Sequence, residues 1–279
     1  MTDQVALVTG ASRGLGRVIA RALARRGATV ALAARSREGL DEVVRLIEAE
    51  GGAAVAFPVD LGAPGACLQL IDDVRDRLGP VDLLINNAAL VEIAAYPSTR
   101  PDAIEQMIAV NLTAPMMLSR AVLPEMLARD RGHIVNVASL AGLIGVGWGE
   151  VYTATKHGLV GFTRSLRLSA RLTGSQVSAS VVCPGFIDES GMYADLSAST
   201  GARAPLVFGT ITPKMVTQAV LRAIDDDVPQ IIVNQTPVRP LCGVLAILPR
   251  LGERLTAWLG THRVFREVIA AHSGQTEWR

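Results

Sequence analysis

The sequence has no surplus of charge of either sign: 27 Lys and Arg residues stand against 26 Asp and Glu residues, for a formal net charge of +1. A general nucleic-acid binder needs a basic surplus to meet phosphates, so this balance argues against that class. The three cysteines are widely spaced without a CxxC pair, which predicts neither a disulfide framework nor a metal cluster. No uncharged apolar run reaches the roughly 18 residues of a membrane span. The N-terminus lacks the features of a signal peptide, and we expect a cytoplasmic protein.

Short apolar runs alternate with segments of helical periodicity. Strands that are apolar throughout and separated by helices are typical of a parallel sheet covered on both faces. The pattern therefore predicts an α/β, doubly wound Rossmann-type fold of about seven strands. We expect residues 1–234 to form one dinucleotide-binding and catalytic domain, 186–211 to be a loop, and 235–279 to be a helical C-terminal extension. The predicted strands are Val5–Val8, Thr29–Ala33, Ala53–Val59, Val81–Ile85, His133–Val137, Gln176–Val182 and Gln230–Val233.

A glycine-rich turn, TGASRGLG, follows the first predicted strand and opens the first predicted helix. Gly10, Gly14 and Gly16 allow the backbone to approach a pyrophosphate, and the N-terminus of the helix attracts its charge. A glycine turn without a ligand is the alternative, because the spacing differs from G-x-G-x-x-G. The position after the first strand of a doubly wound pattern favours a dinucleotide site.

The residues after the second predicted strand indicate which dinucleotide binds. An NAD site needs an acid there for the ribose 2′-hydroxyl, and no acidic residue occurs between Arg17 and Arg37. Arg35 stands at the end of that strand and Arg13 in the glycine turn, and a guanidinium suits a 2′-phosphate. Solvated surface arginines are the alternative, chiefly for Arg37. We expect NADP(H) to be preferred over NAD(H).

A second cluster combines Tyr152 with Lys156, one of only two lysines in the chain. On a helix these positions share a face, and a cation beside a phenol lowers the pKa of the phenol toward working pH. Ser139 lies 13 residues upstream of Tyr152, just past the fifth predicted strand. This arrangement suggests a proton donor or acceptor with a neighbouring hydroxyl.

With these motifs in order, the chain resembles the compact type of the short-chain dehydrogenase/reductase family over roughly residues 3–234. The resemblance rests on TGASRGLG, Asp60, NNAA at 86–89, Asn111, IVNVAS, YTATK and Pro184-Gly185. It departs from the family pattern at Ala89, where glycine is usual, and at Glu189 and Ser190, where a threonine often contacts the carboxamide.

The resemblance implies a role for each matching residue. Tyr152 would be the acid/base, Lys156 would bind the nicotinamide ribose and lower the pKa of Tyr152, Ser139 would hydrogen-bond the substrate oxygen, and Asn111 would hold a water for proton relay. Together with Tyr152 and Lys156, the implied cofactor-binding residues are Gly10, Ser12, Arg13, Gly14, Leu15, Gly16, Arg35, Asp60, Leu61, Asn87, Pro184, Gly185 and Ile187.

The expected function is an NADP(H)-dependent oxidoreductase for a mainly hydrophobic ketone or alcohol, because segments 140–151 and 186–211 are largely apolar. One alternative is a 3-oxoacyl-thioester reductase that docks a carrier protein through Arg129, Arg131 and Arg171; another is a non-catalytic nucleotide sensor on the same fold.

The expected assembly is a homodimer or homotetramer built on the long helices near 101–129 and 152–172, as is common in the family. The extension has two apolar stripes at helical spacing and a basic surplus. It would cover the substrate cleft, extend an oligomer interface or lie on a membrane surface, in decreasing order of preference. Its stripes are Leu251, Leu255, Trp258 and Leu259, then Phe265, Val268 and Ile269.

Overall fold

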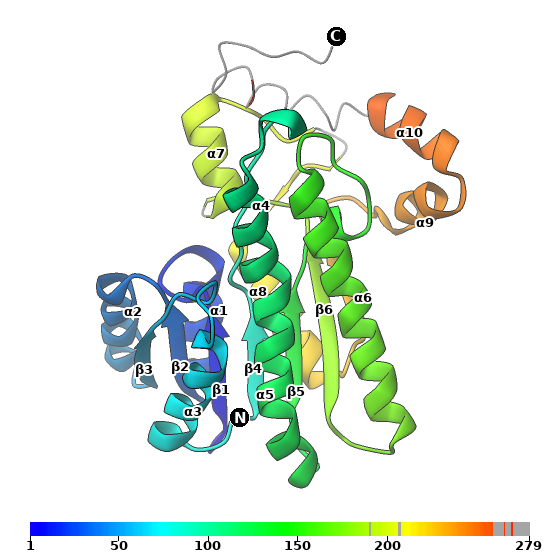
Figure 1. The fold of residues 1–279 in the computed structure, drawn as a ribbon. Helices are drawn as coiled ribbons and strands as arrows, with labels where there is room; N and C mark the ends of the chain where they lie inside the picture. The colour runs from blue at the N-terminus through cyan, green and yellow to red at the C-terminus, as the bar shows by residue number, and fades with distance from the viewer. Residues whose placement is uncertain (190, 206–207, 259–264, 266–268, 270–279) are drawn as a thin grey trace.

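The computed structural model describes residues 1–189, 191–205, 208–258, 265 and 269. Seven parallel strands form one sheet in the order β3-β2-β1-β4-β5-β6-β9 (Figure 1). The order reverses between β1 and β4, and ligands of such folds bind outside the carboxyl ends of the strands at this point. The strands are β1 (Val5–Thr9), β2 (Thr29–Ala34), β3 (Ala53–Pro58), β4 (Leu83–Asn86), β5 (His133–Val137), β6 (Ser178–Pro184) and β9 (Gln230–Val233).

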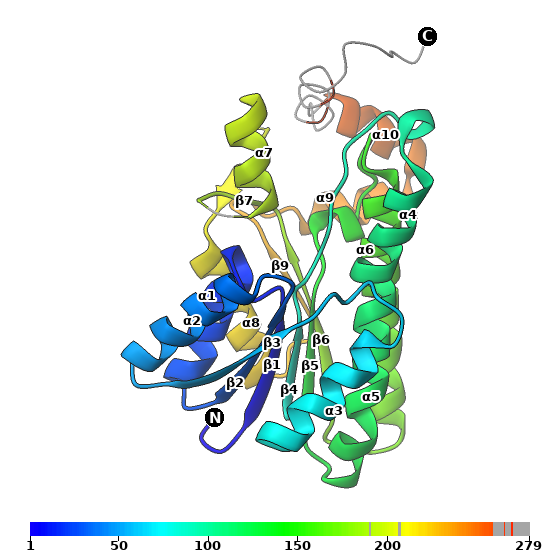
Figure 2. The same ribbon diagram turned by 60° about the vertical axis from the view of Figure 1, so that its left-hand side comes forward.

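Helices cover both faces of the sheet, as Figure 2 shows, and the predicted doubly wound fold is confirmed. Alternate strand residues face opposite layers, so Val8 packs in the cluster that contains Ile19 and Val216, while Leu7 packs in the cluster that contains Leu70 and Leu118. One face carries α1 (Gly14–Arg25), α2 (Arg37–Ala49) and α8 (Pro213–Asp225). The other carries α3 (Ala66–Leu78), α4 (Pro101–Ile108), α5 (Ala114–Ala128) and α6 (Glu150–Leu172).

The long helix predicted near 101–129 is continuous but changes its winding. A π-helical segment, η2 (Ala109–Thr113), joins α4 to α5. Pro115 has no N–H to donate to the carbonyl of Asn111, which accounts for irregular winding at this point. Within the described residues, Pro101–Ala128 is the one helix long and apolar enough to cross a membrane by length and composition. Its inner face packs on the sheet through Leu118, Val122 and Met126.

The prediction of a loop over 186–211 was wrong in part. β7 (Phe186–Ile187) pairs with β8 (Thr210–Ile211), and α7 (Met192–Thr200) lies between them. No residue of α7 is fully buried, so no apolar stripe marks it in the sequence.

The extension forms α9 (Arg239–Ile247) and α10 (Pro249–Trp258), which lie beyond the carboxyl ends of the strands, as α7 does (Figure 1). Within its predicted stripes, Leu259 and Val268 lie outside the described residues. The division of the chain at residue 234 stays a prediction.

At the opposite end of the sheet, a buried polar network joins β5 and β6 to the turn before β9. His133 Nε2 lies 2.9 Å from Ser180 Oγ, which donates to the carbonyl of Val228 at 2.7 Å. Burial lowers the pKa of His133 to about 4. Burial raises the pKa of Asp227, but hydrogen bonds from Arg167 and Ser178 outweigh it and hold that pKa at about 2. Both shifts therefore make the fold less stable in acid than at neutral pH, because the unfolded chain binds protons that the folded chain excludes.

We expect His133 to make the fold acid-sensitive. Its pKa falls from 6.5 to about 4 on folding, so the unfolded chain binds a proton that the folded chain excludes, and stability falls as pH drops through this window. The loss between neutral pH and pH about 5 should be about 2 kcal/mol. Urea unfolding at both values measures it. His133→Gln should remove most of the pH dependence, and His157→Gln, at an exposed histidine, should keep it. An equal loss of unfolding free energy between the two pH values in all three proteins would contradict the assignment of the acid sensitivity to His133.

Candidate active site

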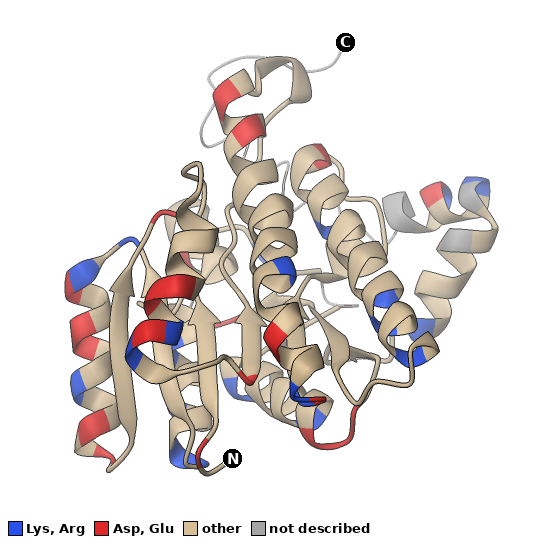
Figure 3. Cartoon of the chain, turned by 60° about the horizontal axis from the view of Figure 1, so that its bottom comes forward, with Lys and Arg blue, Asp and Glu red and all other residues tan. Residues whose placement is uncertain are grey.

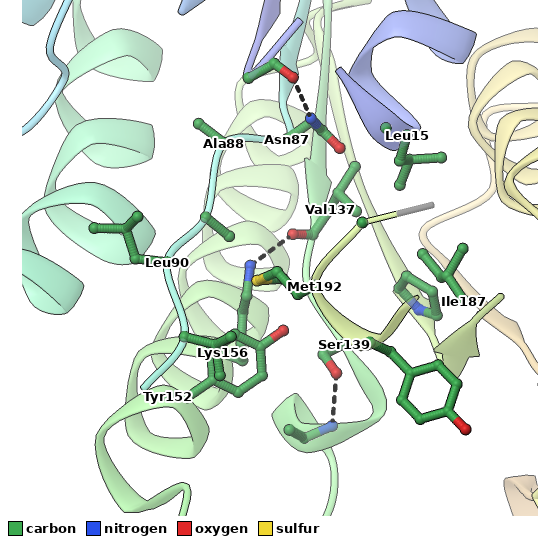
Figure 4. A pocket seen from close by; sticks show the side chains of 18 of the residues that line it. Leu15, Asn87, Ala88, Leu90, Val137, Ser139, Tyr152, Lys156, Ile187 and Met192 are labelled. Atoms are coloured by element: carbon green, nitrogen blue, oxygen red, sulfur yellow. Dashed lines mark hydrogen bonds between the residues drawn. The ribbon is translucent and has the colours of Figure 1, made fainter. Parts of the chain in front are cut away.

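A cavity of about 530 Å³ lies at the carboxyl ends of the strands and gathers residues that are far apart in the chain. The predicted cofactor-binding residues all line it, from Gly10 in the glycine turn to Ile187 on β7. Of the predicted catalytic residues, Ser139, Tyr152 and Lys156 line it and Asn111 does not. Figure 4 shows part of this lining. Their individual roles stay predictions at this point.

The glycine turn is shaped for a close approach of its backbone to a ligand. Gly10 and Gly14 have φ angles of +65° and +56°, which favour glycine, and a Cβ on Gly16 would collide with the carbonyl oxygen of Gly10. No side chain caps the N-terminus of α1, and Gly14, Leu15 and Gly16 line the cavity. The uncapped first turn of this helix therefore fits the pyrophosphate of a dinucleotide.

Thr9, which the sequence analysis did not single out, holds the neighbouring segment in place. Its Oγ1 accepts hydrogen bonds from the backbone N–H groups of Asn87 at 2.9 Å and Ala88 at 3.0 Å. The Asn87 side chain donates in turn to the Thr9 carbonyl at 2.9 Å. Thr9 is a polar residue at the end of an otherwise apolar, buried strand, and this position could have indicated its hydrogen-bonding role from the sequence.

The end of the cavity near β2 carries the residues expected at the adenosine. Arg35 is exposed and lines the cavity, and it has no ion pair with any residue that the structure describes. Asp60 accepts a hydrogen bond from the backbone of Gly62 at 3.0 Å. Arg37, by contrast, pairs with Asp41 at 3.1 Å and does not line the cavity, so the surface alternative fits this arginine.

Arg13 has a partner that the sequence did not reveal. Its guanidinium pairs with Asp195 of α7 at 2.8 Å, and both side chains are more than half exposed, at 75% and 56%. An exposed pair of this kind contributes little to stability. The pair joins the glycine turn to α7.

The catalytic cluster combines α6 with the end of β5. Lys156 is almost fully buried, and its Nζ donates to the Val137 carbonyl at 3.0 Å (Figure 4). The same Nζ lies 5.6 Å from the centre of the Tyr152 ring. Ser139 Oγ accepts from the backbone N–H of Ala141 at 3.1 Å, and the polar Ser139 side chain acts to lower the pKa of the Tyr152 hydroxyl. A phenol, a hydroxyl and an ammonium group therefore meet at one point of the cavity wall.

The expected direction of the Tyr152 pKa shift was wrong for this structure. Burial raises the pKa of Tyr152 to about 12, and the polar Ser139 side chain opposes the rise only in part. Burial also lowers the pKa of Lys156 to about 8. The Lys156 ammonium is directed at the Val137 carbonyl, so desolvation decides the outcome. The phenol is consequently held in its neutral, proton-donating form.

Asn111 lies behind the cavity wall. It is fully buried in η2, where its Oδ1 accepts from the Leu90 N–H at 2.7 Å and its Nδ2 donates to the Leu90 carbonyl at 2.8 Å. The Nδ2 also donates to Thr155 Oγ1 at 3.2 Å, and Thr155 donates to the Tyr152 carbonyl. The side chain thus positions the Leu90 segment and α6, and its predicted contact with a relay water stays a prediction.

The rest of the cavity is apolar. The charged residues among its described lining, Arg13, Arg35, Asp60 and Lys156, belong to the part assigned to the cofactor. The predicted apolar walls 140–151 and 186–211 do contribute, and Phe265 of the extension, which was expected to cover the substrate cleft, also lines the cavity; the segment after Asn87 was missed. Ser190 lies outside the described residues. The apolar lining includes Leu90, Val91, Ile93, Leu140, Ile144, Val146, Phe186, Met192, Tyr193, Leu196, Phe208 and Phe265.

The arginines considered for carrier docking are bound to acidic residues. Arg129 and Arg131 both pair with the buried Asp82, and Arg171 pairs with Asp227. Arg171 is nearly at the far end of α6 from Tyr152, about 28 Å away at 1.5 Å per residue. Within one subunit these cations are remote from the cavity opening.

The fold and this cavity define a dinucleotide-binding oxidoreductase of the Rossmann type. The sequence profile of the family described as short chain dehydrogenase matches residues 4–201. The chain belongs to this short-chain dehydrogenase/reductase family, and the resemblance seen in its motifs is confirmed.

Several relatives are named as ketoacyl reductases. The chain is 40% identical over 265 residues to "Ketoacyl reductase HetN" of Nostoc sp., covering 93% of this chain and 90% of that protein. It is 39% identical to "Granaticin polyketide synthase putative ketoacyl reductase 1" of Streptomyces violaceoruber, over 66% of this chain and 68% of that protein. A solved metagenomic short-chain oxidoreductase in complex with NADP superposes with a TM-score of 0.72 at 36% identity, covering 85% of this chain and 99% of that one.

Proposed function

We propose that this enzyme uses NADPH to reduce the ketone of a mainly hydrophobic substrate. The observation that carries the proposal is that Tyr152, Ser139 and Lys156 come together in the cavity lining, where its glycine-lined part meets its apolar part. The cofactor supplies the hydride. The matching alcohol oxidation is the same reaction in reverse.

Each polar residue of the cluster then has a defined task. The Ser139 hydroxyl and the Tyr152 O–H hydrogen-bond the carbonyl oxygen, and Tyr152 delivers its proton there as negative charge develops. Lys156, fixed by the Val137 carbonyl, orients the ribose and supplies positive charge beside the phenol. Apolar side chains exclude water from this point.

A 3-oxoacyl thioester is the favoured form of this substrate among the alternatives. HetN and the Streptomyces relatives bear the name ketoacyl reductase, and the apolar part of the cavity suits an acyl chain. The structure gives no support to docking by Arg129, Arg131 and Arg171 within one subunit, because acidic side chains already bind them. The sensor alternative is disfavoured, since a sensor has no need of the Ser139–Tyr152–Lys156 cluster.

A substrate panel tests this proposal. NADPH oxidation is followed by absorbance with free ketones, 3-oxoacyl thioesters of a small thiol, and the same acyl groups on a carrier protein. We expect turnover with apolar ketones and with small thioesters. A strong advantage of the carrier-bound form would identify a carrier-protein reductase. No oxidation of NADPH by any member, and no reduction of NADP by the alcohols, would contradict the proposal.

We further propose that the protein assembles as a homodimer or homotetramer. The outer faces of α4, α5 and α6 carry few charged side chains (Figure 3), and Ile108, Met116, Leu127 and Leu168 are exposed on them. Such a face suits the contact expected of a homodimer or homotetramer. A cytoplasmic location stays a prediction, as does contact of the extension with a membrane surface.

A further inference from the structure

Aromatic rings from three distant segments meet in the lining of the apolar part of the cavity. The rings belong to Phe186 on β7, Tyr193 on α7 and Phe265 of the extension. The centres of Phe186 and Tyr193 are 5.0 Å apart with an edge-to-face angle of 61°. The centres of Phe186 and Phe265 are 6.4 Å apart with an angle of 35°. Both separations are those of interacting aromatic pairs.

We propose that Phe265 is a specificity-determining residue, which limits the length of the apolar chain that a ketone substrate extends past Phe186. The inference rests on the proposed function and adds the substrate feature that the extension recognises. Nothing in the family motifs points to this residue, because it lies beyond the matched segment 4–201.

The other two rings are held by folded elements of the domain. Tyr193 Oη accepts a hydrogen bond from the Ala204 N–H at 2.6 Å, which fixes its ring against the chain after α7. Ala202 is fully buried in the cluster that also contains Ile93 and Leu196. These residues present an apolar surface, and Phe265 packs against that surface.

The extension is anchored close to this cluster. Leu241, Cys242 and Leu245 of α9 pack against a buried group that includes Leu140 and Phe208. Leu140 and Phe208 also line the cavity, so α9 supports its wall from outside. Figure 2 places α9 and α10 at the same end of the sheet as α7. Within the described part of the extension, Phe265 is the residue that faces the cavity itself.

The contacts of Phe265 determine what it recognises. Its described neighbours are apolar or aromatic, and the charged lining of the cavity lies at the cofactor. Contact with a substrate chain is therefore a matter of shape and apolar burial, without selection for a charged terminus. Each buried methylene contributes about fourfold in affinity, so a wall that admits or blocks two methylenes changes selectivity by about tenfold or more.

The test uses the full-length protein, NADPH and unbranched methyl ketones that lengthen from butanone one methylene at a time. Phe265→Ala should move the optimum of kcat/KM to longer ketones, with about a tenfold gain for ketones two methylenes beyond the wild-type optimum. Phe265→Trp should move the optimum to shorter ketones. Phe265→Leu serves as a milder enlargement if the alanine variant does not fold. Leu251→Ala is the control, because this side chain is exposed on α10 and does not line the cavity.

The outcomes separate the two proposals. If the wild type reduces the ketones and the Phe265 variants keep its chain-length optimum, the inference about Phe265 is overturned and the proposed function stands. If the wild type reduces none of these ketones and no 3-oxoacyl thioester, and oxidises none of the matching alcohols, the proposed function fails, and binding decides the inference. The same ketones are then used to displace a fluorescent apolar dye from the NADP complex of each protein. The ketone length that binds most tightly should be greater for Phe265→Ala than for the wild type. An unchanged preferred length overturns the role of Phe265.

Discussion

Tyr152→Phe is expected to lower kcat by about 10²–10⁴-fold, the contribution typical of a positioned acid or base. The substitution removes only the phenolic oxygen and leaves the ring beside Lys156. Because that oxygen donates the proton to the developing alkoxide, its loss affects the chemical step. The affinity for NADPH should change little. Steady-state kinetics with the best ketone of the panel and fluorescence titration with NADPH measure the two effects.

The control for this variant is Tyr96→Phe, which makes the same chemical change at an exposed phenol outside the cavity. It should retain wild-type kinetics. A Tyr152→Phe enzyme with the wild-type rate would remove Tyr152 from the mechanism. Equal losses of NADPH affinity and of kcat/KM would instead indicate a damaged cofactor site.

The wild type is expected to bind NADPH about 10²-fold more tightly than NADH. Arg35 lines the cavity at the end of β2 and Arg13 enters from the glycine turn, so both can meet a 2′-phosphate. A well-formed charge-assisted hydrogen bond contributes roughly 1.5–3 kcal/mol, and exposure favours the lower end. Two such bonds give about 10²-fold, at about 1.4 kcal/mol per factor of ten.

The ion pair of Arg13 with Asp195 does not remove this expectation. Both side chains are exposed, so the pair contributes little and a doubly charged phosphate competes well for the guanidinium. Arg35 has no such competitor among the described residues. We therefore expect Arg35 to make the larger contribution to the preference.

A double variant tests the cofactor assignment directly. Ala34 lines the cavity at the end of β2, where an acid would hydrogen-bond the ribose 2′-hydroxyl of NAD. Ala34→Asp with Arg35→Ala should shift the preference toward NADH. Arg37→Ala is the matched control, because Arg37 pairs with Asp41 outside the cavity, and it should keep the wild-type ratio. Fluorescence titration at one fixed ionic strength gives the dissociation constants. Equal affinities in the wild type, or tighter NADH, would refute the preference.

Local sequence patterns were sufficient to predict the sheet with its two helical layers and the glycine turn that faces the cofactor. Apolar runs such as Val5–Thr9 are buried on both sides, which only a sheet between two helical layers allows, so their pattern identifies the fold. Gly10 and Gly14 have left-handed backbone angles, and a turn of this kind leaves its mark as glycine in the sequence. The i, i+4 spacing of Tyr152 and Lys156 likewise placed them on one helical face.

Weakly patterned segments were not predicted well. The helix α7 has no fully buried residue and shows no apolar periodicity, so the sequence predicts a loop there. The residues after Asn87 form irregular chain whose apolar side chains turn into the cavity. Their direction depends on the hydrogen bonds of Thr9 and Asn111, which come from other elements.

By itself the sequence determined the family, the doubly wound sheet and the identity of the residues at the glycine turn and the Tyr152 cluster, because these depend on local periodicity and on short motifs. Only the tertiary structure decided that the Tyr152 pKa rises, that Asn111 is buried behind the wall, that Asp195 meets Arg13 and that Phe265 reaches Phe186. Each of these follows from burial or from contact between residues distant in the chain. Desolvation and long-range packing are properties of the assembled fold, and no local pattern records them.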